Sequence, residues 1–138
     1  MKYHLLAFMV AASLAASHNE GFDREPAGSL PKDWTVAMTH DGGPPKWEIL
    51  RDSSAPSSPN VFAQTSTDDT NARYPLAISP AAPFRNGRVS VMFKAVSGKR
   101  DQAAGIVWRY RDPDNYYIVR ANALENNVVM YKLEAGKR

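Results

Sequence analysis

The sequence contains no cysteine, which excludes both a disulfide framework and a metal site built on thiolates. Histidine is nearly as scarce: of three, only His40 lies well inside the chain, because His4 and His18 are close to its beginning. A histidine-based metal cage or a Ser-His-Asp triad therefore lacks its residues. His40 stands directly before Asp41-Gly42-Gly43, and we interpret it as a turn residue rather than a catalyst.

Long hydrophobic runs and helical periodicity are missing after residue 17. No glycine-rich phosphate loop follows a strand, and no internal repeat recurs at a fixed period. What is present is a set of short alternating segments separated by turns, in a chain of 138 residues with 10 Pro and 8 Gly. This pattern is typical of a single all-β domain.

The first 17 residues are predicted to be a signal peptide. Lys2 precedes an apolar run too short to span a bilayer, and Ala15-Ala16-Ser17 supplies the small residues that a signal peptidase reads. A buried amino-terminal helix is the alternative. We therefore expect an exported protein, periplasmic or extracellular, whose domain covers residues 18–138 and which has no membrane anchor after signal removal.

Charge is distributed unevenly along the rest of the chain. Residues 18–70 carry 4 basic and 9 acidic side chains, net −5, whereas residues 71–138 carry 12 basic and 5 acidic side chains, net +7. The carboxy-terminal half is thus the positive part, and a binding site for a polar ligand is sought there.

Residues 103–134 are the stretch around which the fold is organised, and they read as three antiparallel strands. Asp112-Pro113-Asp114-Asn115 is a strong turn that pins the first pair, so that Trp108 faces Val119 and Tyr110 faces Tyr117. A second loop over residues 123–127 places the last strand beside them. Further strands are predicted over residues 34–38, 46–51, 61–65, 74–78 and 88–96, the last being the clearest alternating one.

This register predicts a sheet with two unlike faces. One is almost continuously apolar and is expected to form the core, with Trp108, Tyr117, Val119, Tyr131 and Phe93 buried together. The other alternates guanidinium groups with flat side chains, a mixture suited to sugar rings and their hydroxyls. The candidate ligand-binding residues on it are Arg109, Arg111, Tyr116, Arg120 and Asn122. The alternative is that long arginine stems only cover an exposed sheet.

Other candidate sites are weaker. Asp112 and Asp114 are better explained by the turn than by catalysis, and no pair of carboxylates has the spacing of a glycosidase strand. Asp68-Asp69 could offer oxygens to calcium, but two adjacent aspartates in a polar turn are usually solvated. Trp47 is either core or an extra platform for a sugar. We predict no metal and no cofactor, and the same arginines and tyrosines make single-stranded nucleic acid a minor alternative.

The segment Gly105-Ile106-Val107-Trp108-Arg109-Tyr110-Arg111-Asp112-Pro113-Asp114-Asn115-Tyr116-Tyr117-Ile118-Val119-Arg120 resembles a strand-turn-strand signature of exported bacterial proteins, the 3-keto-disaccharide hydrolase domain family. The resemblance implies a concanavalin A-like, antiparallel jelly-roll sandwich and carbohydrate-related chemistry. The resemblance does not assign a catalytic residue in this sequence. In that family several more strands follow, and Ala135-Gly136-Lys137-Arg138 is a turn, so we expect a fold that is incomplete at the carboxy terminus.

Three functional classes follow from these observations. As an enzyme, the protein would act on 3-keto glycosides and would need converging carboxylates. As a lectin-like module, it would need only the surface of arginines and aromatic rings. As an interaction domain, it would present that surface to another protein. The family resemblance alone puts a saccharide ligand ahead of the other interpretations, and the oligomeric state is left open.

Overall fold

The structure is a computed structural model that describes residue 19, residues 21–57 and residues 59–138. The predicted signal peptide, residues 1–17, lies outside the described residues. Within the described part no helix is long and apolar enough to cross a membrane. Its regular structure consists of antiparallel strands without a helix, so the protein is all-β, as the sequence predicts.

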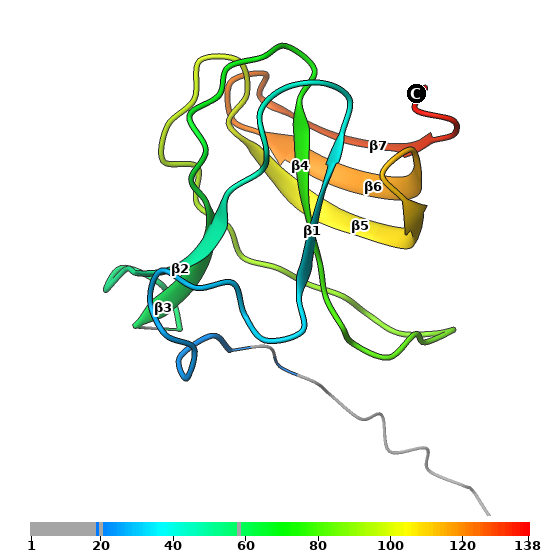
Figure 1. The fold of residues 1–138 in the computed structure, drawn as a ribbon. Helices are drawn as coiled ribbons and strands as arrows, with labels where there is room; N and C mark the ends of the chain where they lie inside the picture. Colours follow the sequence, from blue (N-terminus) through cyan, green and yellow to red (C-terminus); the bar gives the residue numbers. More distant parts are fainter. Residues whose placement is uncertain (1–18, 20, 58) are drawn as a thin grey trace, which may run out of the picture.

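Seven strands are formed by the described residues, and Figure 1 shows their arrangement. They are β1 (Thr35–Thr39), β2 (Trp47–Arg51), β3 (Asn60–Gln64), β4 (Tyr74–Ile78), β5 (Ala103–Asp112), β6 (Asn115–Asn122) and β7 (Asn127–Leu133). They pair as β1–β4, β2–β3 and β5–β6–β7. The predictions for β1 to β4 are correct to within one residue at each end, because turn-forming residues flank each of these segments.

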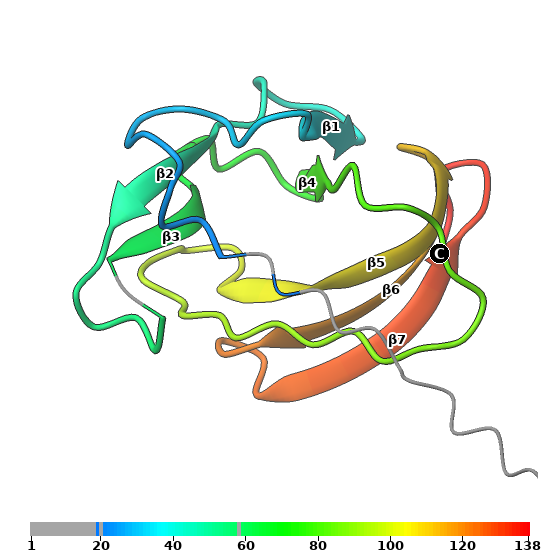
Figure 2. The same cartoon turned by 90° about the horizontal axis from the view of Figure 1, so that it is seen from below.

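The β1–β4 pair lies over the concave face of the β5–β6–β7 sheet, which gives the molecule two layers (Figure 2). Leu76 of β4 meets Tyr116 of β6 and Leu133 of β7 at the centre, and all three are buried. Further side chains pack around them, namely Ala37, Ile78, Val107, Tyr110, Ile118 and Tyr131. We call the covered side of the three-stranded sheet its inner face and the opposite side its outer face. The arrangement is that of a β-sandwich.

A second apolar cluster lies around β2 and β3, at the opposite end of the molecule from the β5–β6 turn (Figures 1 and 2). The ring of Phe62 contacts the rings of Phe22, Trp34 and Trp47, with centroids 5.2, 5.1 and 5.1 Å away. Ile49 is fully buried beside them. Trp47 is therefore a partly buried member of this cluster, which favours a packing role over a sugar platform.

The turn at residues 112–115 forms as predicted. The Asp112 carboxylate accepts from the backbone N–H of Asp114 at 2.9 Å and from the Asn115 amide at 2.8 Å, which fixes the reversal. Asp112 pairs with Asn115, but Trp108 pairs with Tyr117 instead of Val119. Three residues of β5 between Trp108 and Asp112 stand opposite one residue of β6, so β5 has a bulge that the sequence analysis did not predict.

The loop between β6 and β7 is one residue shorter than predicted. Asn122 pairs with Asn127, so the loop consists of residues 123–126. The side chain of Asn122 accepts from the N–H of Leu124 at 3.1 Å, and Asn126 adopts a positive φ of 49°, which together close the tighter turn. The shift by one residue sets Tyr131 beside Ile118 and Leu133 beside Tyr116.

These two differences overturn the predicted assignment of the faces. The face that carries Tyr116, Ile118 and Arg120 is the inner one, whereas Trp108 stands on the outer face, half-buried and stacked on Tyr117 at 5.7 Å between ring centroids. Of the five residues predicted to be buried together, only Tyr131 packs in the inner core. The prediction failed because alternation identifies two faces but not which of them the other layer covers.

The predicted strand over residues 88–96 is not formed either. Residues 79–102 run as an irregular connection from β4 to β5, and their side chains are mostly exposed, with Phe93 at 45% and Met92 at 78%. A strand needs a neighbour to satisfy its backbone groups, and this segment pairs with none of the described strands. Its alternation is therefore a property of the sequence that this fold does not use.

Candidate functional site

The five candidate residues do not share one surface. Arg109, Arg111 and Tyr116 line a hollow of about 340 Å³ at the turn end of the β5–β6 hairpin. Arg120 and Asn122 lie toward the other end of β6 and do not line it. The prediction of a single face opposite the core is thus wrong, because Tyr116, Arg120 and Asn122 point to the inner face. We call the hollow at the hairpin end the bulge cleft.

The bulge in β5 shapes this cleft. Arg109 has a φ of 51°, an unusual conformation for a residue other than glycine, and bulges of this kind redirect a side chain out of the regular alternation. The guanidinium carbon of Arg109 lies over the Tyr117 ring, 5.5 Å from its centroid. A cation held over a ring in this way is attracted by the electron-rich face. The strained backbone thus sets a cation above an aromatic platform.

Aromatic rings form the walls of the bulge cleft. Tyr117 lines it from the outer side, with Trp108 stacked behind it, and Tyr110 and Tyr116 line it from the inner side, 6.3 Å apart between centroids. Leu133 adds a buried apolar surface. From alternation along the strands, Tyr110 and Tyr117 were expected in the core rather than at a ligand site. The bulge in β5 brings both of them to the same hollow as Arg109.

The hydroxyl of Tyr116 is already engaged. The Thr39 hydroxyl donates to the Pro113 carbonyl oxygen at 2.6 Å, so it can only accept from the Tyr116 hydroxyl, which lies 2.9 Å away. Burial raises the pKa of Tyr116 above its usual value, which keeps its hydroxyl protonated and able to donate. Tyr116 therefore anchors β1 to the β5–β6 turn and offers the cleft only part of its ring.

Charged side chains form the rim of the bulge cleft, namely Arg109, Arg111, Lys132 and Glu134. Lys132 donates to the Glu134 carboxylate at 2.6 Å, and this bond lowers the pKa of Glu134 and raises that of Lys132. Among the hydrogen bonds and ion pairs of the described residues, none involves the guanidinium of Arg109 or Arg111. The rim therefore presents two arginines whose donors are available to a ligand.

Arg120 and Asn122 have structural partners on the inner face. Arg120 binds Glu125 at 3.0 Å, and Asn122, which is buried, donates to Asp101 at 2.6 Å and accepts from the N–H of Gln102 at 3.2 Å. Burial by itself would lower the pKa of Arg120, but the bonds to Glu125 and to the Tyr131 hydroxyl raise it. These contacts tie together the ends of β5 and β6 and the β6–β7 loop, and they leave little for a ligand.

His40 behaves as the turn residue that the sequence predicts. It has a φ of 64°, and its two ring nitrogens lie 3.0 Å from the Ala72 carbonyl oxygen and 2.7 Å from that of Gly136. Two carbonyl acceptors require two N–H donors, which only the protonated ring has, and these bonds raise the pKa of His40. The ring fastens the loop before β4 and the chain after β7 to the end of β1.

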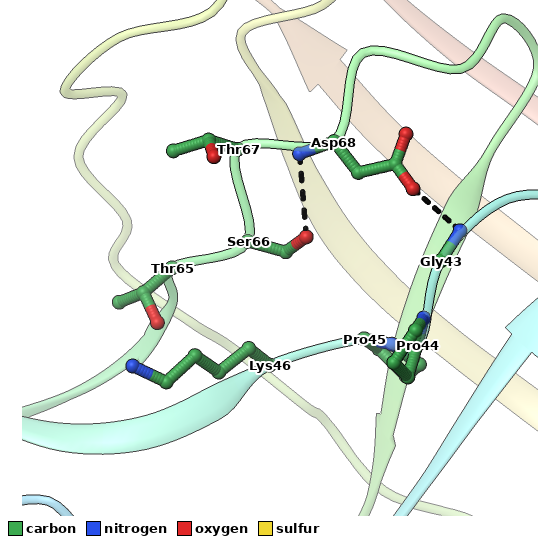
Figure 3. A pocket seen from close by; sticks show the side chains of 8 residues that line it. All are labelled: Gly43, Pro44, Pro45, Lys46, Thr65, Ser66, Thr67 and Asp68. Carbon is green, nitrogen blue, oxygen red and sulfur yellow. Dashed lines mark hydrogen bonds between the residues drawn. The ribbon is translucent and has the colours of Figure 1, made fainter.

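A second hollow lies between the β1–β2 connection and the segment after β3 (Figure 3). It is wide and open, with a volume of about 620 Å³, and Asp68 lies at one side of it. The Asp68 carboxylate accepts from the N–H of Gly43 and from the N–H and hydroxyl of Thr70, which lowers its pKa to about 2. Its oxygens thus hold together the β1–β2 connection and the segment after β3. No group of three metal-ligating side chains occurs among the residues that the structure describes.

Comparisons with known proteins identify no relative of this chain. No protein-family model, no curated protein and no solved structure matches the chain. The bulge cleft is therefore the feature from which a function is inferred.

Proposed function

We propose that this protein binds a saccharide in the bulge cleft and that it does so as a lectin-like module of an exported β-sandwich protein. The observation that carries the proposal is the placement of the Arg109 guanidinium over the Tyr117 ring, in the same hollow as Arg111. Arg109 and Trp108 already lie against the Tyr117 ring. The apolar face of a pyranose would therefore contact the part of that ring left open and the ring of Tyr110, while planar donors are suited to its ring oxygen and hydroxyls. The cleft combines both within a volume typical of small-molecule sites, which begin at about 300 Å³.

Binding is better supported than hydrolysis. Cleavage of a glycosidic bond by the usual route needs two carboxyl groups on opposite sides of the bond. Among the described residues that line the bulge cleft, Glu134 is the single carboxylate, and it is bonded to Lys132. Asp112 stands close by in sequence, but its oxygens accept from Asp114 and Asn115 in the turn. A 3-keto-disaccharide hydrolase activity, which the family resemblance implies, would need a second carboxyl group beyond those of the cleft.

The concanavalin A-like jelly-roll type and export are parts of the same proposal. The two-layered antiparallel architecture supports the first, since such sandwiches present saccharide sites on the loops and ends of their sheets. Residues 1–17 support the second. Intact-mass measurement of protein secreted by a bacterial host tests export: we expect a mass that lacks the first 17 residues, and a retained amino terminus would contradict it.

A thermal-shift screen tests the binding function. Neutral mono-, di- and oligosaccharides, together with 3-keto-disaccharides, are added in large excess to the full chain. A ligand present at 100 times its dissociation constant stabilises the fold by about 2.7 kcal/mol, which a melting curve resolves easily. We expect at least one saccharide to raise the melting temperature.

Two variants of Tyr117 locate the effect. Tyr117→Phe keeps the flat ring and should keep the shift, whereas Tyr117→Leu keeps an apolar side chain without a platform and should lose it. The proposal fails if no saccharide shifts the unmodified protein, or if both variants respond as the unmodified protein does.

A further inference from the structure

The geometry points to an acidic saccharide as the ligand of the bulge cleft, with the carboxylate of a hexuronic acid held by Arg109 and Arg111. This inference rests on the proposed saccharide binding and specifies its substrate class. Neither the sequence patterns nor the comparisons indicate such a class. The case is made by the charges at the cleft, by the conformation of the two arginines and by the charge of the surrounding sheet.

The rim of the bulge cleft is positively charged. Three cations line it, Arg109, Arg111 and Lys132, against the single carboxylate of Glu134. Glu134 is bonded to Lys132 at 2.6 Å, and Glu134 and Asp112 also attract Arg111 electrostatically, so the three cations of the rim still outnumber these two carboxylates. A sugar carboxylate would add a counterion for Arg109 and Arg111, which a neutral sugar cannot do.

Arg109 and Arg111 both reach the bulge cleft, so one anion bound there has access to both side chains. Arg109 and Arg111 are separated by Tyr110 alone, on the part of β5 that the bulge distorts, and both line the same hollow. Arg109 is held over the Tyr117 ring, which reduces the freedom it would lose on binding. Arginine presents its donors in a planar fork that matches the two oxygens of a carboxylate. The sugar ring attached to that carboxylate would then lie toward the tyrosine walls.

The wider surroundings favour the same ligand. Residues 71–138, which contain the whole β5–β6–β7 sheet, carry 12 basic and 5 acidic side chains. One of the acidic residues, Asp112, directs its oxygens to the turn, and another, Asp101, accepts from Asn122 on the inner face. The net positive field of this half would speed the approach of a polyanionic chain and repel cationic ones.

The experiment uses a matched pair of ligands: trigalacturonic acid and its fully methyl-esterified form, which have the same rings and linkages but differ in charge. Dissociation constants are measured by isothermal titration calorimetry with the full chain at low salt. A hydrogen-bonded charge is worth about 1.5 to 3 kcal/mol, so the acid should bind about tenfold more tightly than the ester or better. The advantage should shrink with salt, as the Debye length falls from about 30 to about 8 Å between 0.01 and 0.15 M.

Variants then show whether the preference for the acid depends on the arginines of the cleft or on the overall positive charge of the protein. Arg111→Ala and Arg109→Ala should weaken the binding of both trisaccharides, since both arginines line the proposed saccharide site, but should weaken the acid more, so that the acid and the ester bind about equally. Arg51→Ala is the matched control, because Arg51 is an exposed arginine at the end of β2, on the other side of the molecule (Figure 1). It removes the same charge and should retain the preference. Sulfated trisaccharide and inorganic sulfate are run beside the acid to distinguish a carboxylate site from a general anion site.

The outcomes distinguish the two levels of the proposal. If the acid and the ester bind equally well, or if Arg51→Ala reduces the preference as much as Arg111→Ala does, the acidic class is overturned while saccharide binding stands. Equally tight binding of inorganic sulfate alone also overturns it, since no sugar is then required. If neither the trisaccharides nor any neutral saccharide of the thermal-shift screen binds, the proposed function itself fails.

Discussion

The two faces of the β5–β6–β7 sheet differ in a way that hydrophobicity does not explain. The outer face carries Ile106, Trp108 and Val119, yet none of the described strands covers it. The inner face carries Arg120 and Asn122, yet it lies beneath β1–β4. The polar groups of the inner face are tolerated because most of them are hydrogen-bonded. The comparison shows that burial depends on which face the other layer covers. The bulged end of the sheet, where both faces meet one hollow, is the place left for a ligand.

Substitutions on β7 give the largest expected difference between the two faces. Leu133 is buried on the inner face, so Leu133→Ala should lower the free energy of unfolding by about 2 to 5 kcal/mol, through lost contacts and a cavity. Met130 is 71% exposed on the same strand, and Met130→Ala should change it by less than about 0.5 kcal/mol. Urea denaturation measures both. Equal costs for the two variants would show that the faces are assigned wrongly.

Removing one hydroxyl group from each of two adjacent tyrosines, one on each face, gives a finer comparison of the two faces. Tyr116→Phe removes the donor to Thr39 and should cost about 0.5 to 1.5 kcal/mol, because a buried hydrogen bond is lost. Tyr117 faces the outer side, and Tyr117→Phe should leave the stability almost unchanged. Chemical denaturation of both variants provides the measurement. A cost for Tyr117→Phe that exceeds the one for Tyr116→Phe would contradict the observed register.

The sequence predicts this fold correctly where an element is determined by its own residues. It fails where an element depends on the strand that pairs with it or the layer that covers it. Asp112-Pro113-Asp114-Asn115 identifies its own turn, because Pro113 presets φ and Asp112 bonds to the next residues. The bulge at Arg109 has no such signature, since an arginine is not expected at a positive φ. Residues 88–96 alternate more clearly than β4, which contains Pro75, yet β4 is the strand because it pairs with β1.

The candidate site was predicted only in part, for the same reason. Arg109 and Arg111 were found because exposed arginines beside tyrosines suggest a polar ligand, and they do line the bulge cleft. Tyr117 and Lys132 were missed, since the bulge and the β6–β7 register bring them to the cleft. Arg120 was selected by alternation along β6, which does not reveal that Glu125 holds it.

A smaller effect is expected from the pH dependence of His40, which stands at the edge of the inner layer. Its bonds to the carbonyls of Gly136 and Ala72 raise its pKa above 6.5, with nearby Asp114 and Asp41 acting in the same direction. Because the folded protein holds this proton more tightly, the stabilisation is complete below pH 6.5 and is lost as the pH rises through the folded-state pKa. Urea titrations across this range should show the loss, and His40→Gln should remove it. An unchanged slope in the variant would contradict this role.

The smallest stability change is predicted at Arg109 itself. Arg109→Gly removes the guanidinium but relieves a left-handed backbone conformation, so the free energy of unfolding should stay within about 0.5 kcal/mol or rise slightly. Saccharide affinity should nevertheless fall. Thermal denaturation with and without ligand measures both quantities on one sample. A substantial loss of stability would mean that Arg109 supports the fold rather than a ligand.

The central claim, that the bulge cleft is the binding site, is tested most directly by mapping a bound saccharide onto the backbone. Amide chemical shifts of isotope-labelled protein are recorded during titration with the tightest ligand of the thermal-shift screen. We predict that the largest changes lie at Arg109, Arg111, Tyr117 and Lys132. Changes centred on the hollow between Gly43 and Asp68 (Figure 3), or spread evenly over the molecule, would contradict the claim.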